Sequence, residues 1–504
     1  MKTKLIAGLC SAALAATCFS MATFADEEFT TYEPTAENVK LLGRTYYNGE
    51  SLWFSLTNSG VEYQFTGTAT KITVSGDANA VSATDGARIA VFADGERVKD
   101  TMLTFNPQTL TVNLEEGTHT IKLLKISESA NGSIFIDDIS VNGEGAITPT
   151  AAKKHSIEFI GDSITCGYGI DSKNENEHFS TFTEDGSRTY AYKAAQKLDA
   201  DYSMVSYSGF GVLSGYTGNG QINTTGLVSK YYDKVGFSWG WANGHTISEN
   251  DWDFSAKPND LVVVNLGTND ASYTKKNAEK IADFTDAYVD FIKLIREKNP
   301  DSEILCTLGI MGQDLYNAIE EAVNKYSEET GDIKVNTLKF DVQDTADGLG
   351  GDWHPSEKTH EKAANKLIDE INKLYGWEID ESVDISASEN KLKPILEDEN
   401  GNPILPPDDS SGEDSSSEAV SSSDDTSSKD DESSSVNSSA ADTSSAASSS
   451  VSASSSASTS SKATTTSSAA SKAGDSNPTT GYAAAGAAFA VLALGCIAVA
   501  KKQK

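Results

Sequence analysis

Four short stretches, far apart in the chain, carry residue types that together could perform acyl transfer. A serine hydroxyl becomes a good nucleophile when a neighbouring base takes its proton. A histidine suits that task because its charge changes near neutral pH. The stretches are Gly161-Asp162-Ser163, Ser208-Gly209, Gly267-Thr268-Asn269-Asp270 and Asp352-Trp353-His354-Pro355.

The same stretches could supply the remaining parts of such a site. Asp352 stands two residues before His354 and could accept from the other imidazole nitrogen, which would fix the tautomer. The backbone amides of Ser163 and Gly209 and the side-chain amide of Asn269 could donate to an oxyanion. If the pKa of His354 lies near its reference value, activity should rise around pH 6–7.

Each of these residues also has a simpler structural interpretation. Ser163 could merely cap a helix, but a cap would not account for His354. We expect Asp162 to fix the turn and Asp270 to cap a helix. His354 and His360 are six residues apart with no third ligand, which is poor metal spacing. We therefore expect no metal and no cofactor, and we expect His360 to be a solvated helix residue.

The elements that must position these residues alternate between strands and helices. Such alternation gives a parallel sheet between two helix layers, and sites form at the carboxyl ends of its strands. We predict a three-layer α/β/α domain at residues 155–378, with a five-stranded parallel sheet and a long insertion at 210–258. The predicted strands are 156–163, 200–209, 260–270, 302–310 and 333–340, and the predicted helices are 189–198, 276–297, 314–328 and 356–375.

Residues 36–148 have the two-residue periodicity of β-strands instead. Short alternating segments separated by Gly, Asn or Asp predict an antiparallel β-sandwich, with a hairpin turn at residues 115–120. Such a domain could bind carbohydrate or could serve only as a packing partner. The two roles stay open, because a fold does not fix a function.

The two ends of the chain have the patterns of export and anchoring segments. Residues 1–25 resemble a signal peptide, and residues 379–476 predict a disordered, acidic, Ser-rich linker. Residues 477–504 combine Asn-Pro-Thr-Thr-Gly, an apolar segment at 482–500 and a basic tail. They resemble a sortase signal, which implies attachment to peptidoglycan on a Gram-positive cell surface. A plain membrane anchor is the alternative, and both place the protein outside the cell.

Composition narrows the possible partners. The 504-residue chain has a formal net charge of −34, which disfavours binding to nucleic acid or to anionic membranes. A neutral polysaccharide is not penalised. Only Cys166 and Cys306 lie in the predicted folded units, so we do not expect disulfides to define the fold.

The four stretches resemble blocks I, II, III and V of the SGNH (GDSL-like) hydrolases. With a β-sandwich in front, residues 36–376 are similar to carbohydrate esterase family 2. The resemblance implies a jelly-roll domain joined to an SGNH domain, and removal of O-acetyl groups, chiefly at 6-O positions, from plant polysaccharides. It implies an acetyl-serine intermediate with Ser163 as nucleophile, His354 as base, Asp352 as orienting acid, and Ser163, Gly209 and Asn269 as oxyanion donors.

Aromatic residues near the four stretches could stack on sugar rings. Tyr207, Phe210 and Trp353 are the candidates, with Trp239 and Trp241 in the insertion, although each could equally belong to an apolar core. We expect a monomeric enzyme acting on an acetylated polysaccharide or oligosaccharide. Two other functions stay open: a non-catalytic carbohydrate-binding surface protein, and an SGNH lipase or acyltransferase.

Overall fold

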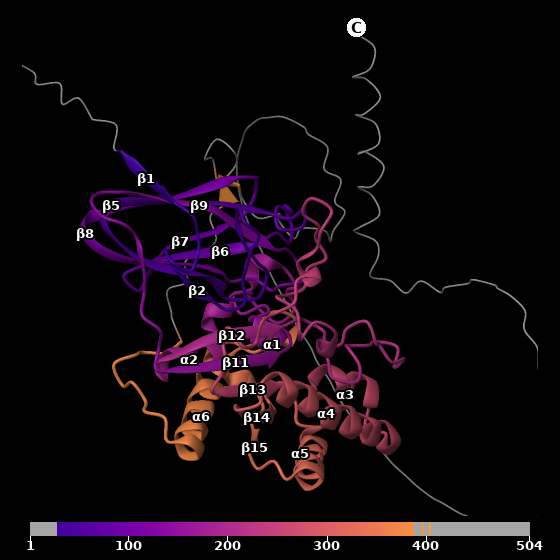
Figure 1. Cartoon of the computed structure of the whole chain (residues 1–504). Helices are drawn as coiled ribbons and strands as arrows, with labels where there is room; N and C mark the ends of the chain where they lie inside the picture. Colours follow the sequence, from indigo (N-terminus) through magenta and orange to yellow (C-terminus); the bar gives the residue numbers. More distant parts are fainter. Residues whose placement is uncertain (1–27, 388–395, 398–402, 405–504) are drawn as a thin grey trace, which may run out of the picture. The chain divides into compact units, whose positions relative to one another are not determined.

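A computed structural model describes residues 28–387, 396–397 and 403–404 of the chain. These residues form an antiparallel β domain followed by an α/β domain (Figure 1). The signal peptide and sorting signal predicted at residues 1–25 and 477–504, and most of the predicted linker, lie outside them. No helix in the described part of the chain combines the length and the apolar character that a bilayer crossing requires.

The β domain confirms the antiparallel prediction, but its ten strands form one continuous hydrogen-bonded sheet. The sheet is continuous because β5 and β8 are each 18 residues long and pair along most of their length. The strands are β1 (Phe29–Tyr32), β2 (Lys40–Leu42), β3 (Tyr46–Tyr47), β4 (Leu52–Phe54), β5 (Ser59–Gly76), β6 (Arg88–Ala93), β7 (Glu96–Met102), β8 (Gln108–Lys125), β9 (Ile134–Asn142) and β10 (Thr148–Pro149).

The hairpin predicted at residues 115–120 is wrong, because β8 runs through this segment without a turn. Gly117 pairs with Gly67 of β5, and the register shifts by a β-bulge between Gly67 and Ala69. Bulges and strand glycines bend a sheet locally. The turn-forming residues therefore mark a bend, and long-range pairing with β5 overrides the local preference for a hairpin.

The α/β domain has the predicted five-stranded parallel sheet, in the order β12-β11-β13-β14-β15. Each predicted strand and helix is present, but the strand predicted at 260–270 ends at Asn265, and residues 268–270 begin helix α3. The elements are β11 (His155–Gly161), α1 (Ser163–Cys166), α2 (Tyr190–Lys197), β12 (Ala200–Ser206), β13 (Leu261–Asn265), α3 (Thr268–Thr274), α4 (Ala278–Lys298), β14 (Glu303–Leu308), α5 (Tyr316–Thr330), β15 (Val335–Lys339) and α6 (Glu357–Tyr375).

The two faces of this sheet are covered by different helices. Leu261 and Val263 of β13 pack in a core with α2 and α6, whereas Val262 and Val264 pack in a core with α4 and α5. Successive side chains of a strand point to opposite faces, so a continuous apolar run fills both cores. This packing fixes the height of the strand ends, where the polar stretches follow.

The fold continues past the linker boundary predicted at residue 379. Ile385 is buried in the core beside α2 and α6. Lys193 donates to the Ile385 carbonyl at 2.9 Å, and Lys197 donates to the Val383 carbonyl at 3.1 Å. Residues 379–387 therefore belong to the α/β domain. Beyond them, β16 (Leu396–Glu397) pairs with β17 (Pro403–Ile404).

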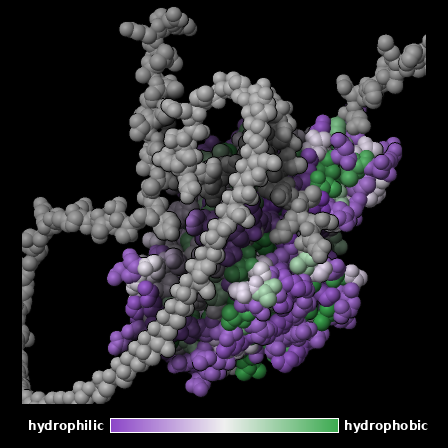
Figure 2. Space-filling model, turned by 180° about the vertical axis from the view of Figure 1, so that it is seen from behind, coloured by the Kyte–Doolittle hydropathy of each residue, from purple (hydrophilic) through white to green (hydrophobic). Residues whose placement is uncertain are grey.

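Buried charged pairs join the β domain to the α/β domain, and both belong to one compact unit. Arg44 pairs with Glu158 of β11 at 2.8 Å, and Arg88 pairs with Asp171 at 2.9 Å. On the face shown in Figure 2, hydrophilic residues predominate and hydrophobic residues form scattered patches. The two ion pairs, Arg44 with Glu158 and Arg88 with Asp171, support a packing role for the β domain.

Candidate active site

Ser163 and His354 meet at the end of β11. Ser163 is the first residue of the one-turn helix α1, and Asp162 caps that helix by accepting from the Ile164 N–H at 3.0 Å. The Oγ atom of Ser163 lies 2.9 Å from Nε2 of His354. A base within hydrogen-bond reach of the hydroxyl can take its proton during attack. The geometry is therefore that of a nucleophile and its general base.

A backbone carbonyl orients the histidine. Nδ1 of His354 lies 3.0 Å from the Gly351 carbonyl oxygen. A carbonyl can only accept, so this contact requires the proton on Nδ1 and leaves Nε2 free to accept from Ser163. The tautomer needed for proton abstraction is thus fixed by main chain.

The bond expected between Asp352 and the imidazole is not the one the structure contains. The Asp352 carboxylate accepts from the Tyr168 hydroxyl at 2.5 Å and lies 2.8 Å from Nδ1 of His178. The reason lies in the backbone: Asp352 and Trp353 have φ of 48° and 59°, and this left-handed turn directs the Gly351 carbonyl toward His354. Asp352 acts on the imidazole through its charge, without a direct side-chain bond.

Tyr168 belongs to this arrangement, although the sequence did not single it out. Its ring stacks on the imidazole of His354, with centroids 3.8 Å apart and an angle of 18° between the planes. Its hydroxyl also holds Asp352. Its place five residues after Ser163 is the only sequence signal that it could join the site.

Burial lowers the pKa of His354 to about 4. The Asp352 charge and the Gly351 carbonyl act in the opposite direction but do not compensate. The expectation of a transition around pH 6–7 is therefore corrected, because it used the value of a solvated histidine. The base is already neutral, and able to accept a proton, well below neutral pH.

The three predicted oxyanion donors come to neighbouring strand ends. Gly161 at the end of β11 pairs with both Ser206 of β12 and Asn265 of β13. Gly209 follows β12 with φ of 79°, a conformation that suits glycine. No hydrogen bond among the described residues uses its N–H, which leaves it available to a ligand.

Asn269 is buried in the first turn of α3, and its side chain links two of the stretches. Its amide donates to the Phe210 carbonyl at 2.8 Å and more weakly to the Asp162 carboxylate at 3.4 Å. The longer bond is the easier one to exchange for an oxyanion. Burial raises the pKa of Asp162 to about 7.

Asp270 is not the helix cap that we expected. It lies inside α3, and its carboxylate accepts from the N–H groups of Val212, Leu213 and Ser214 at 2.7–3.2 Å. Burial raises its pKa to about 6 despite these bonds. Asp270 thus shapes the loop that follows Gly209.

The aromatic candidates divide into buried and exposed residues. Tyr207 and Phe210 are buried in a cluster with Tyr231 and Phe237, so the prediction that they stack on sugar is wrong in this structure. Large aromatic rings near a site serve equally well as core. The exposed rings are Trp353 at 54%, Trp239 at 60% and Trp241 at 59%.

His360 is fully buried, which corrects the expectation of a solvated residue. Its Nδ1 accepts from the Tyr190 N–H at 3.2 Å, because α6 presents this face to α2. His360 therefore helps to hold α2 against α6.

Two family models match the chain. One, described as GDSL-like Lipase/Acylhydrolase, matches residues 157–367, and the other, Carbohydrate esterase 2 N-terminal, matches residues 41–150. A carbohydrate esterase family 2 enzyme of Corynascus thermopiles (Myceliophthora fergusii), solved with a carbohydrate binding domain, is 31% identical. The match covers 67% of this chain and 100% of that one, with a TM-score of 0.56. The chain belongs to carbohydrate esterase family 2.

Two further esterases are similar to the chain. The acetyl xylan esterase Est2A of the rumen bacterium Butyrivibrio proteoclasticus is 26% identical, covering 69% of this chain and 99% of that one, with a TM-score of 0.63. Cellulase/esterase CelE of Acetivibrio thermocellus is 32% identical over 328 residues, which are 64% of this chain and 37% of CelE. The chain thus spans just over a third of that relative. Family 2 comprises enzymes that hydrolyse carboxylic esters of carbohydrates, and the Ser163–His354 pair suits that chemistry.

Proposed function

We propose that the protein is a secreted, surface-anchored serine esterase that removes O-acetyl groups, chiefly at 6-O positions, from plant polysaccharides or their oligosaccharides. The observation that carries the proposal is the 2.9 Å contact between Ser163 Oγ and His354 Nε2 at the strand ends of a family 2 chain. The Gly351 carbonyl keeps the base in the competent tautomer.

The reaction follows from the positions of the side chains. Ser163 Oγ attacks the acetyl carbonyl while Nε2 of His354 takes its proton. The amides of Ser163, Gly209 and Asn269 stabilise the charge on the carbonyl oxygen. His354 then returns the proton to the sugar oxygen, which leaves as a hydroxyl. A water then attacks the acetyl-Ser163 intermediate while His354 takes its proton. The bond between the acetyl group and Ser163 Oγ breaks, His354 returns the proton to Oγ, and acetate leaves; no cofactor takes part.

The choice of an acetylated polysaccharide rests on surface chemistry and on relatives. Trp353 is exposed beside the base, and an exposed aromatic face can stack on a sugar ring. The strong negative charge of the chain disfavours anionic polymers. Est2A is an acetyl xylan esterase, which favours xylan among the candidate glycans.

The decisive experiment measures acetate release from acetylated xylan and acetylated glucomannan, with Ser163→Ala as the matched control. We expect release from at least one glycan, abolished by the substitution. Binding of the glycan without release would favour a carbohydrate-binding protein. A preference for nitrophenyl esters of long acids over the acetate would favour a lipase or acyltransferase.

The cellular location is a separate part of the proposal, supported by residues 1–25 and 477–504. We expect covalent attachment to peptidoglycan through Thr480, so that a peptidoglycan hydrolase, but not detergent alone, releases the protein. Release by detergent of a chain that still contains residues 482–504 would instead identify a plain membrane anchor.

A further inference from the structure

The loop between β8 and β9, residues 126–133, reaches from the β domain to the catalytic strand ends. The Ile126 carbonyl accepts from the Gly186 N–H at 2.8 Å, and the Ala130 carbonyl accepts from the Trp239 N–H at 3.0 Å. Three further bonds from this loop, one made by Ser129 and two by Glu128, also enter the α/β domain. The loop is therefore attached to several catalytic-domain segments at once.

Glu128 makes the contact closest to the oxyanion donors. Its side chain is 3% exposed, and its carboxylate accepts from the Ser208 N–H at 2.9 Å. Its own N–H donates to the Glu184 carboxylate at 2.7 Å. Ser208 immediately precedes Gly209. Glu128 therefore holds the backbone N–H one residue before the N–H that is predicted to donate to the oxyanion.

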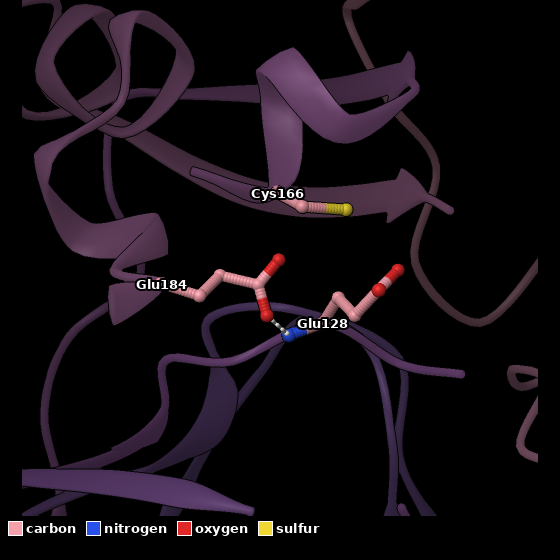
Figure 3. A group of neighbouring side chains, drawn as sticks. All are labelled: Glu128, Cys166 and Glu184. Carbon is pink, nitrogen blue, oxygen red and sulfur yellow. Dashed lines mark hydrogen bonds between the residues drawn. The ribbon is translucent and has the colours of Figure 1, made fainter. Parts of the chain in front are cut away.

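Glu128 shares its surroundings with two other buried polar side chains. Glu128, Cys166 and Glu184 extend into the same space from three separate segments (Figure 3). The fully buried Lys125 donates to the Glu128 carbonyl at 2.6 Å and brings a positive charge to this space. Burying a carboxylate is costly in free energy unless it is hydrogen-bonded. The bond from the Ser208 N–H is therefore needed to offset the burial of Glu128.

We propose that Glu128 of the β domain is a positioning residue for the oxyanion hole: its carboxylate holds the Ser208 N–H and thereby sets the direction of the Gly209 N–H beside Ser163. The inference rests on the proposed function of that site. It makes the β domain part of the catalytic apparatus, since a loop from one domain fixes a donor that belongs to the other.

A bound metal ion is the competing explanation for the cluster. Ligand atoms of Glu128, Cys166 and Glu184 lie within 4.8 Å of one another. However, Lys125 already supplies a cation there, and the Cys166 thiol donates to Ser206. Burial also raises the pKa of Glu184 well above its usual range, which opposes the ionised form that a metal ligand needs.

The test compares kcat and KM on a small acetyl ester for Glu128→Ala and Glu128→Gln, with melting temperatures for both. We expect Glu128→Ala to lower kcat roughly 10- to 100-fold with KM nearly unchanged, less than the loss of a whole oxyanion donor. Glu128→Gln keeps an oxygen acceptor for Ser208 and should stay within about threefold of wild type. Arg44→Gln is the matched control, because it breaks buried bonds between the same domains without touching residues 207–214.

Each outcome decides between a positioning role and another role. An unchanged kcat in Glu128→Ala would overturn the proposal. So would losses of kcat in Glu128→Gln and Arg44→Gln that only follow the fall in their melting temperatures, because such losses would show a structural role. Stoichiometric metal in the purified wild type that is lost from the variants would also overturn it. A wild type inactive on acetyl esters, or an active Ser163→Ala, would instead remove the proposed function itself.

Discussion

The nucleophile side and the oxyanion side of the candidate site are held in place by different parts of the molecule. His354 is oriented by the Gly351 carbonyl and by the ring of Tyr168, both within the α/β domain. The loop after β12 is held by two buried carboxylates, Asp270 of α3 and Glu128 of the β domain. In the proposed mechanism, proton transfer therefore depends on local backbone, whereas charge stabilisation depends on the packing of two domains.

The largest effect should come from the nucleophile side. Ser163→Ala and His354→Ala should each lower kcat by several orders of magnitude, because either change prevents attack. The double variant should cost little more than either alone, since the two residues act as one unit. Initial rates on a small acetyl ester, with thermal melts as the folding control, measure this. A folded Ser163→Ala protein that keeps more than a few per cent of activity would place the nucleophile elsewhere.

On the oxyanion side, Asn269→Ala should lower kcat roughly 10²–10³-fold, the usual loss for one preorganised donor. The matched control is Asn277→Ala, which removes the N-cap of α4 and should cost about 1 kcal/mol of stability without changing kcat. An Asn269→Ala loss that only matches this control would mean that Asn269 supports the loop through Phe210 without donating to the oxyanion.

The role of Asp352 distinguishes a side-chain triad from a main-chain support. In a Ser-His-Asp triad, neutralising the acid lowers kcat by about 10⁴-fold. Because Gly351 already holds Nδ1, Asp352→Asn should lower kcat about tenfold or less. His178→Ala, which removes the exposed partner of Asp352, is the control and should have almost no effect. A loss near 10⁴-fold would restore Asp352 as the orienting acid.

The pH dependence of activity tests whether His354 is a buried base that is neutral at acidic pH. With a pKa of about 4, His354 is about 90% neutral at pH 5, so activity should fall only as the pH approaches 4. As the pH falls, His354 in the unfolded chain, with its reference pKa of 6.5, binds a proton before His354 in the folded chain does. Unfolding free energy therefore also decreases between pH 6.5 and about 4. Rates normalised to the folded fraction separate the two effects.

A transition near pH 6 would contradict the assignment of the acid limb to His354. Asp270, with its pKa raised by burial to about 6, is then the group to examine. A transition that moves in Asp270→Asn belongs to the loop after Gly209. A transition that stays near pH 6 belongs to another buried group, for which Asp162, with its pKa raised by burial to about 7, is the next candidate.

The smallest kinetic effect concerns the end of the α/β domain. A chain ending at residue 387 should keep the wild-type melting temperature, and one ending at 378 should melt several degrees lower. The shorter chain loses the burial of Ile385, worth roughly 1.5–3 kcal/mol. Both should keep wild-type rates on small esters, because the segment lies against α2. Equal melting temperatures would show that residues 379–387 contribute nothing to stability.

Much of the fold was predictable because its signals are local. Apolar runs that end in polar residues define the parallel strands, and parallel pairing alone brings Ser163, Gly209 and Asn269 to one edge of the sheet. The segment at residues 115–120 shows the limit: its turn-forming residues lie in an unbroken strand, since pairing with β5 is a long-range interaction.

The supporting residues of the site were harder to predict for a related reason. The acceptor for His354 is the main-chain carbonyl of Gly351. Every residue has such a carbonyl, so the residue type does not predict which one contacts the histidine. Glu128 lies in another domain, and its contact with Ser208 depends on how the domains pack. Tyr207 was misassigned because an aromatic ring beside a strand end fits a core as well as a sugar.

The carbonyl behind His354 has an evolutionary consequence. A side-chain acceptor can be lost by one nucleotide change, but a backbone carbonyl is present whatever residue the codon specifies. What selection must retain is the left-handed turn at residues 352 and 353, together with Gly351, where a Cβ would lie 2.8 Å from the Glu177 carbonyl oxygen. The acid at position 352 can therefore drift among homologues while the base keeps its tautomer, so a search that demands an aspartate there would overlook competent enzymes.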